Sequence, residues 1–279
     1  MLIQWGANWC GWCNWLAATM QHNPELSHEL LYEYELVHLD LGHFDKNLDL
    51  AKELGAEIKS IPYLTILGAD GKTVVHSNSE PFEIKEATPA GDHHDAAKLV
   101  AFLAEHQARP VDAKVVRAAA LAQAKKDGRM VFLRFGAPWC GPCHRLADWM
   151  VQPEIEALLA KDFVDVYIDQ DRMPGGKEML AAEAATAGVQ ADGIPWFVFC
   201  DADGKQLATS SGEKGTIGFP YAPDAVAHFA KMLEKCKRNL TSADVETLTA
   251  SLDAIRAADE AKQQEEAQTK APKAGESGQ

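Results

Sequence analysis

Residues 6–13 read Gly-Ala-Asn-Trp-Cys-Gly-Trp-Cys, and residues 136–143 read Gly-Ala-Pro-Trp-Cys-Gly-Pro-Cys. Each stretch places a Trp-Cys-x-x-Cys between an apolar run typical of a β-strand and an amphipathic run typical of a helix. In that context a Cys-x-x-Cys pair predicts a redox-active dithiol. The sequence therefore predicts two such sites in one chain.

The similarity between the two halves extends beyond the cysteines. Ile61-Pro62 recurs 133 positions later as Ile194-Pro195. A group around the dithiol recurs 130 positions later: Trp9, Cys10, Cys13, Leu16 and Met20 become Trp139, Cys140, Cys143, Leu146 and Met150. A repeat of this period indicates two domains within the 279 residues, each of roughly 100–130 residues.

The order of apolar runs predicts the fold class. Residues 114–237 are expected to form helix, strand, helix, strand, helix, two strands and a helix, with a possible kink of the second helix at Pro153. Residues 2–107 repeat this order without the first helix, so the first domain is expected to be short at its N-terminus. The pattern predicts an α/β chain in which each domain has a mixed sheet flanked by helices.

The expected domain boundaries are residues 1–108, 113–238 and a tail of residues 239–279. The tail is predicted to be helical to about Ala258. Its last 15–20 residues or so are rich in Glu, Gln, Lys, Ala and Gly, and we expect them to be disordered.

The position of each dithiol at the start of a helix gives its cysteines distinct roles. Unpaired N–H groups and the helix dipole stabilise a thiolate there, so Cys10 and Cys140 are predicted to be the attacking residues. Cys13 and Cys143 follow about one turn later and are predicted to resolve the mixed disulfide. The residue before the second cysteine is Trp12 in the first site and Pro142 in the second. This difference predicts unequal reduction potentials for the two sites.

These motifs resemble the thioredoxin superfamily, most closely the thioredoxin-like domains of bacterial tandem proteins. Trp-Cys-Gly-Pro-Cys at 139–143 matches the thioredoxin signature, and the first site is a variant of it. The resemblance implies a cis-proline at Pro62 and Pro195, where the preceding Ile61 and Ile194 would pair with substrate backbone. One departure is that Gln4 and Arg134 stand where thioredoxin has a buried Asp.

Several other side chains are candidates for smaller roles. Trp9 and Trp139 are expected to cover the dithiols and contact substrate, together with Trp12 and Pro142, although an ordinary core position is the alternative for Trp9 and Trp139. Cys200 and Cys236 are expected to be buried, inert thiols, with a bond between them as a minor option. The neighbouring histidines, His93 and His94, are interpreted as polar loop residues rather than metal ligands.

The charge of the chain is uneven. Residues 1–108 carry 6 Lys or Arg and 16 Asp or Glu, a net charge of −10, whereas residues 113–238 are neutral. An acidic first domain argues against nucleic acid and anionic membranes as partners.

No apolar run reaches membrane-spanning length. Without a visible signal segment the default compartment is the cytoplasm, with a periplasmic or secreted location open if a signal lies upstream.

The sequence thus predicts a protein thiol–disulfide oxidoreductase, a reductase or isomerase of substrate disulfides. Its partners would be disulfide-containing proteins and a reductase that regenerates the dithiols. No organic cofactor and no resident metal are expected. Two alternatives stay open: a peptide-binding or chaperone-like module in which only the second domain is redox-active, and a carrier of soft metal ions.

Overall fold

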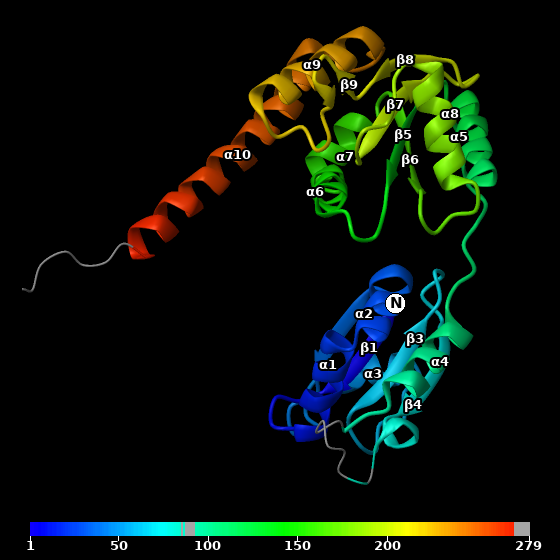
Figure 1. Cartoon of the computed structure of the whole chain (residues 1–279), viewed down its shortest axis with the longest axis vertical. Helices are drawn as coiled ribbons and strands as arrows, with labels where there is room; N and C mark the ends of the chain where they lie inside the picture. The colour runs from blue at the N-terminus through cyan, green and yellow to red at the C-terminus, as the bar shows by residue number, and fades with distance from the viewer. Residues whose placement is uncertain (85, 87–92, 271–279) are drawn as a thin grey trace, which may run out of the picture. The chain divides into compact units, whose positions relative to one another are not determined.

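The computed structural model describes residues 1–84, 86 and 93–270. The chain divides into two compact units, residues 1–109 and 110–279 (Figure 1). Each unit is built around one four-stranded mixed sheet with helices on its faces. The expected α/β class is therefore confirmed. In the described part of the chain, every helix is too short or too polar to cross a membrane.

The first unit orders its sheet β2-β1-β3-β4. Strand β1 pairs in parallel with β2 and antiparallel with β3, which pairs antiparallel with β4. The elements are β1 (Leu2–Gly6), α1 (Gly11–His22), α2 (Pro24–Glu33), β2 (Leu36–Asp40), α3 (Leu48–Glu53), β3 (Tyr63–Leu67), β4 (Thr73–Asn78), a short 3-10 helix (Glu80–Phe82) and α4 (Ala96–His106).

Alternate residues of β1 face opposite sides of this sheet. Leu2 packs with residues of α1, α2 and α4, whereas Ile3 and Trp5 pack towards α3. Among the described residues of this unit, α3 is the helix whose residues pack on that face. Helix α2 was not predicted, although Asn23 accepts a hydrogen bond from the Leu26 amide and Pro24 opens the helix, which are ordinary start signals.

The second unit repeats the arrangement with the strand order β6-β5-β7-β8. Strands β5 and β6 are parallel, and the other neighbouring pairs are antiparallel. The elements are α5 (Ala113–Asp127), β5 (Met130–Gly136), α6 (Gly141–Met150), α7 (Pro153–Leu159), β6 (Phe163–Asp169), α8 (Gly176–Thr186), β7 (Trp196–Cys200), β8 (Gln206–Thr209), β9 (Ser211–Gly212), β10 (Gly215–Thr216), α9 (Pro223–Cys236) and α10 (Ser242–Lys270).

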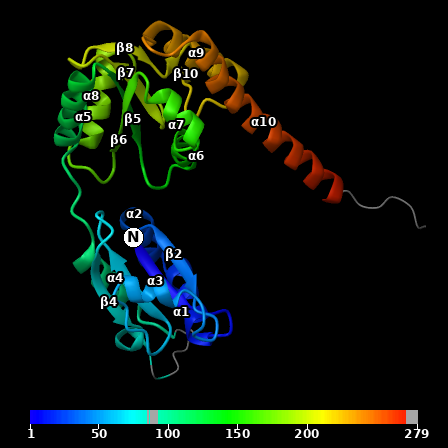
Figure 2. The ribbon, with the colours of Figure 1, turned by 180° about the vertical axis from the view of Figure 1, so that it is seen from behind.

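Helices α5 and α8 cover one face of this sheet, and α6 and α7 lie on the other (Figure 2). The second helix does not continue past Met150 with a kink. It ends there, and Pro153 starts the separate helix α7. A proline in the first turn of a helix costs no hydrogen bond, whereas the same residue inside a helix would remove one.

Helix α10 packs onto the second unit. Val245, Leu248 and Leu252 are buried in the core that α6, α7 and α9 share. The indole N–H of Trp149 on α6 donates a hydrogen bond of 2.8 Å to Ser251 Oγ. The first half of the segment that we expected to be a separate tail therefore contributes to the core of the second unit.

The connection between α9 and α10 is held by one buried carboxylate. Asp162 is 1% exposed and accepts hydrogen bonds from the backbone amides of Arg238, Asn239 and Leu240. Burial alone raises the pKa of Asp162, but the amide hydrogen bonds outweigh it and hold the pKa below its ordinary value. Because the folded pKa is lowered, Asp162 stabilises the fold above the unfolded pKa and loses that contribution as the pH falls.

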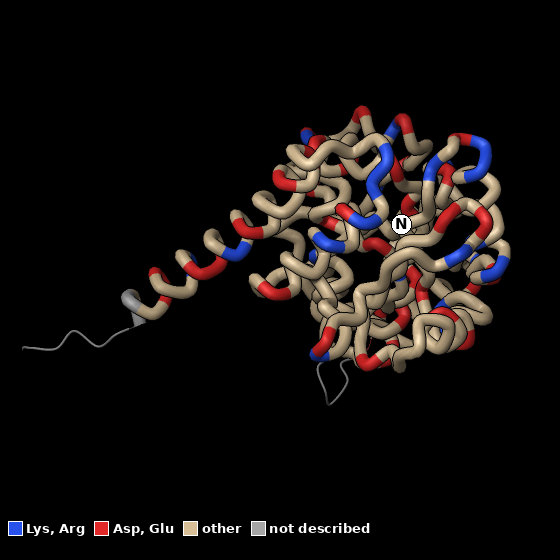
Figure 3. The backbone as a smooth tube through the Cα atoms, turned by 90° about the horizontal axis from the view of Figure 1, so that it is seen from above, with Lys and Arg blue, Asp and Glu red and all other residues tan. Residues whose placement is uncertain are grey.

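The second half of α10 is helical without being buried. Figure 3 shows acidic and basic residues interspersed along it. Helix continues to Lys270, so at least residues 265–270 differ from the expected disorder. Ala, Glu, Gln and Lys are strong helix formers even where they bury no apolar surface. Residues 271–279, the rest of that expectation, lie outside the described residues.

Candidate active sites

The first cysteine pair lies at the start of α1, just after the end of β1. Cys10 is the N-cap residue of α1, and its Sγ accepts a hydrogen bond of 3.2 Å from the Cys13 amide. The two residues form a disulfide, with Cα atoms 5.3 Å apart. Both cysteines are buried, at 6% and 4% exposure. The first sulfur therefore lies at a helix start, where a backbone N–H is already directed at it.

The second pair has the same geometry. Cys140 is the N-cap of α6, and its Sγ accepts a 3.1 Å hydrogen bond from the Cys143 amide. The two form a disulfide with a Cα separation of 5.2 Å. The side chains are 2% and 5% exposed.

Each pair lies against the Ile-Pro dipeptide that recurs in the sequence. Cys10 Sγ is 3.7 Å from the carbonyl oxygen of Ile61, and Cys140 Sγ is 3.6 Å from that of Ile194. The peptide bonds to Pro62 and Pro195 are both cis. The fold thus brings each cysteine that is predicted to attack next to the Ile-Pro backbone that is predicted to bind substrate, although the two are far apart in the sequence.

The tryptophans that precede the dithiols are not core residues, since Trp9 and Trp139 are each 54% exposed. The indole N–H of Trp9 donates to the Gly42 carbonyl at 2.8 Å, and that of Trp139 donates to Asp171 Oδ2 at 2.7 Å. Each ring is therefore anchored by its nitrogen while much of its surface stays open to solvent.

A glycine at the end of each central strand makes room for the second cysteine. A Cβ on Gly6 would lie 3.2 Å from Cys13 Sγ. A Cβ on Gly136 would lie 3.0 Å from Cys143 Sγ and 2.8 Å from the ring of Tyr167. The glycines that begin the two quoted motifs thus allow close packing of strand and dithiol.

The two residues in place of the thioredoxin aspartate behave differently. Gln4 is 3% exposed and donates through Nε2 to the Cys13 carbonyl at 3.1 Å, while its Oε1 has no partner among the described residues. Arg134 instead forms a two-bond ion pair with Asp165, at 2.7 and 2.9 Å, and lies over the Tyr167 ring. The surroundings of Cys13 and Cys143 therefore differ.

Tyr167 is a neighbour of the second dithiol that the sequence pattern did not predict. Burial raises the pKa of Tyr167 to about 12, assisted by Asp169 and opposed by Arg134. The phenol is thus neutral near physiological pH. The register of the parallel strands, which pairs Arg134 with Tyr167, brings it to the site.

An aromatic cluster at the first dithiol was also not predicted from the sequence. Trp12 packs against the Cys10–Cys13 pair and contacts Trp15 edge to face, with ring centroids 5.1 Å apart. It also contacts His94, at 5.5 Å between centroids. The histidine pair expected to be a polar loop instead contains a residue, His94, that is only 2% exposed.

The remaining cysteines are buried and free, so the minor option of a Cys200–Cys236 bond is wrong. Burial raises the pKa of Cys200 to about 12 and that of Cys236 to about 11. Neither forms a thiolate readily. Over residues 1–84, 86 and 93–270, no group of three or more His, Cys, Asp or Glu side chains is placed to hold a metal ion.

Residues 94–257 match the Thioredox_DsbH family, described as "Protein of unknown function, DUF255". The chain belongs to this family. The match agrees with the predicted resemblance to the thioredoxin superfamily. It spans Cys140 and Cys143 and leaves the first dithiol outside, so any role for Cys10 and Cys13 has to be argued from this chain itself.

Two curated relatives are similar to parts of the chain. A "Thiol:disulfide interchange protein TxlA homolog" of Synechocystis sp. is 29% identical over 120 residues, which cover 43% of this chain and 61% of the relative. A "Protein disulfide-isomerase" of Datisca glomerata is 28% identical over 178 residues, which cover 62% of this chain and 32% of the relative. The chain therefore spans less than two thirds of either relative.

Among solved structures, a disulphide isomerase from Xylella fastidiosa Temecula1 is 25% identical. The similarity covers 51% of this chain and 92% of that one, with a TM-score of 0.34.

Proposed function

We propose that this protein is a thiol–disulfide oxidoreductase that reduces or isomerises protein disulfides at two sites. The observation that supports this most directly is the repeated geometry: an N-cap cysteine that receives an amide hydrogen bond, beside the carbonyl of an Ile-Pro dipeptide. The names of the two curated relatives support the same class of activity.

The reaction at each site transfers two electrons. In the reduced protein, the thiolate of Cys10 or Cys140 attacks one sulfur of a substrate disulfide, forms a mixed disulfide and expels the other sulfur as a thiolate. Cys13 or Cys143 then loses its proton and attacks the N-cap sulfur, which releases the second substrate thiol. The protein ends with its own disulfide, and a separate reductase restores the dithiol.

Substrate would bind as an extended strand beside the cis-proline. The carbonyls of Ile61 and Ile194 lie within 4 Å of the attacking sulfurs and would accept a hydrogen bond from substrate backbone. The exposed faces of Trp9 and Trp139 would add apolar contact, with Trp12 and Pro142 beside the sulfurs. These contacts with substrate backbone do not by themselves discriminate between substrate sequences.

The second candidate function is that the first unit only binds peptides. It is favoured by the family match, which begins after the first dithiol.

A turnover assay separates the two candidate functions. The full chain, Cys10→Ser/Cys13→Ser and Cys140→Ser/Cys143→Ser are expected to reduce insulin disulfides with dithiothreitol as reductant, and the variant lacking all four cysteines is expected to fall to the uncatalysed rate. The buried-thiol control Cys200→Ser should retain full activity. If Cys10→Ser/Cys13→Ser turns over and Cys140→Ser/Cys143→Ser does not, the result would support the binding-module alternative.

A further inference from the structure

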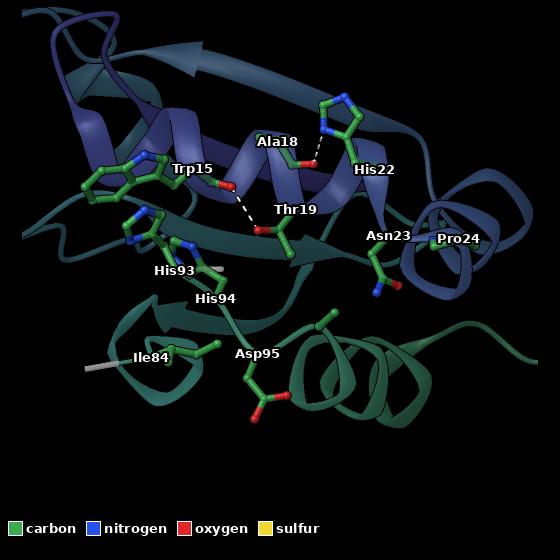
Figure 4. Close-up of a pocket in the computed structure, with 11 residues that line it drawn as sticks. Trp15, Ala18, Thr19, His22, Asn23, Pro24, Ile84, His93, His94 and Asp95 are labelled. Atoms are coloured by element: carbon green, nitrogen blue, oxygen red, sulfur yellow. Dashed lines mark hydrogen bonds between the residues drawn. The ribbon is translucent and has the colours of Figure 1, made fainter. Parts of the chain in front are cut away.

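A pocket of about 500 Å³ lies between α1 and the residues that lead into α4. Pro24, Ile84 and Ala96 supply apolar walls, and Trp15 faces His93 and His94. Figure 4 shows the two imidazoles next to the Trp15 indole. Trp15 and His93 stack with centroids 3.5 Å apart. A hollow of this size accepts a large side chain or a small ligand.

His94 is a buried polar group of this pocket whose ring has no hydrogen-bond partner among the described residues. It is 2% exposed. Burial lowers the pKa of His94, opposed by Glu83, so the ring is neutral and offers one donor and one acceptor. Leaving both unpaired in a buried place is unfavourable, and a ligand group that pairs with either one would relieve it.

Three of the other polar side chains around the pocket already have hydrogen-bond partners. Thr19 donates to the Trp15 carbonyl, Asn23 accepts from the Leu26 amide, and Asp95 accepts from the Lys98 amide. Among the described lining residues none is Lys or Arg. The unit as a whole is acidic. The pocket therefore favours a neutral hydrogen-bonding group over a carboxylate or phosphate.

The pocket is joined to the first dithiol by a single indole. Trp12 packs against Cys10 and Cys13 on one side and meets His94 edge to face on another, with an interplanar angle of 88°. A substrate peptide held at Cys10 advances about 3.3 Å per residue. A residue about two to four positions from the substrate cysteine therefore reaches the pocket.

We propose that this pocket is a side-chain subsite of the first dithiol, a proposal that rests on the function proposed above. It takes an aromatic residue with a neutral hydrogen-bonding end, tyrosine, from a disulfide-bearing polypeptide. The tyrosine ring packs against Trp15 and the apolar wall, and its hydroxyl pairs with His94. The subsite makes the first dithiol selective among substrates, and the residues named for it all belong to the first unit.

The test uses the full chain with Cys140→Ser and Cys143→Ser, so that only the first dithiol reacts. The substrates are ten-residue peptides with one cysteine as a thionitrobenzoate disulfide and Tyr, Phe or Ala three residues to either side. The small disulfide 5,5′-dithiobis(2-nitrobenzoate), which carries neither a peptide backbone nor a tyrosine, reports the reactivity of the dithiol itself. Release of thionitrobenzoate gives kcat/KM for each.

The parent protein is expected to favour the Tyr peptide over the Ala peptide by about tenfold and over the Phe peptide by about threefold. Ala18→Phe places a ring into the pocket from an exposed position of α1 and should bring the Tyr/Ala ratio to about one. Gln21→Phe, exposed on the same helix and outside the pocket lining, is the control and should keep the ratio. His94→Phe should equalise Tyr and Phe.

The outcomes separate the two proposals. With the small disulfide still reduced at the parent rate, an unchanged Tyr/Ala ratio in Ala18→Phe, or no Tyr preference in the parent, would overturn the subsite alone. Failure of the parent to reduce even the small disulfide would overturn the function proposed for the first dithiol, and the subsite with it.

Discussion

Serine in place of Cys140 is expected to stop disulfide reduction in the protein that carries Cys10→Ser and Cys13→Ser. The loss should be on the order of a thousandfold or more, because a hydroxyl at the helix start does not provide the nucleophile that a thiolate does. Cys140 is the sulfur that receives the amide hydrogen bond and lies beside the Ile194 carbonyl.

The matched variant Cys143→Ser should behave differently. The first attack remains possible, but the resolving thiol is absent, so the mixed disulfide with substrate accumulates. Non-reducing mass spectrometry of protein incubated with a disulfide substrate measures this adduct, and turnover is followed in parallel. An adduct that forms on Cys143 in the Cys140→Ser variant would reverse the roles assigned here. Cys200→Ser removes a buried thiol whose pKa of about 12 keeps it protonated at neutral pH, and it should change neither readout.

The second large effect concerns the stability of the second unit. Leu248→Ala is expected to lower its free energy of unfolding by about 2–5 kcal/mol, because Leu248 on α10 is fully buried in the core of that unit. For a unit of this size each kcal/mol corresponds to a change in melting temperature of about 2–4 °C. Thermal unfolding followed by circular dichroism measures the shift.

Two controls separate core packing from helix content. Thr247→Ala, exposed one residue earlier on the same helix, should change the melting temperature by little. Deleting Lys262–Gln279 should also leave it within about a degree or two, since the residues of that stretch whose surroundings are described are exposed. If Leu248→Ala is as mild as Thr247→Ala, α10 does not contribute to the core, and the description of the second unit is wrong.

Local signals were sufficient to predict most of the fold. The apolar runs at 129–135 and 163–169, and the Cys-x-x-Cys at each helix start, predicted elements within a residue or two of those observed. The resemblance to the thioredoxin superfamily implied that Ile61 and Ile194 would lie beside dithiols more than fifty residues away. The elements thus follow from local patterns, and the Ile-Pro placement follows from the resemblance that the motifs carry.

What the sequence did not predict depends on three-dimensional packing. Leu248 and Leu252 lie in a segment of polar composition. They become core residues because they pack with residues of α6, α7 and α9. His94 looked like a loop residue because its burial comes from Trp12 and its neighbours across the fold. Tyr167 reaches Cys143 through strand register, which the linear pattern of one strand does not reveal.

Both dithiols are expected to be redox-active, with unequal reduction potentials. The difference rests on Trp12 against Pro142 and on Gln4 against the Arg134 and Tyr167 pair. One altered hydrogen bond is worth about 1 kcal/mol, and about 30 mV corresponds to about 1.4 kcal/mol for a two-electron couple. Midpoint potentials that differ by a few tens of millivolts are therefore expected.

The direct measurement is a redox titration of two full-length proteins, Cys10→Ser/Cys13→Ser and Cys140→Ser/Cys143→Ser, in dithiothreitol or glutathione buffers. The fraction of reduced dithiol is read by alkylation and mass spectrometry. Each protein is predicted to titrate reversibly as a two-electron couple, at distinct midpoints. Absence of a reversible couple in Cys140→Ser/Cys143→Ser would contradict the claim of two active sites, and coincident midpoints would contradict their inequality.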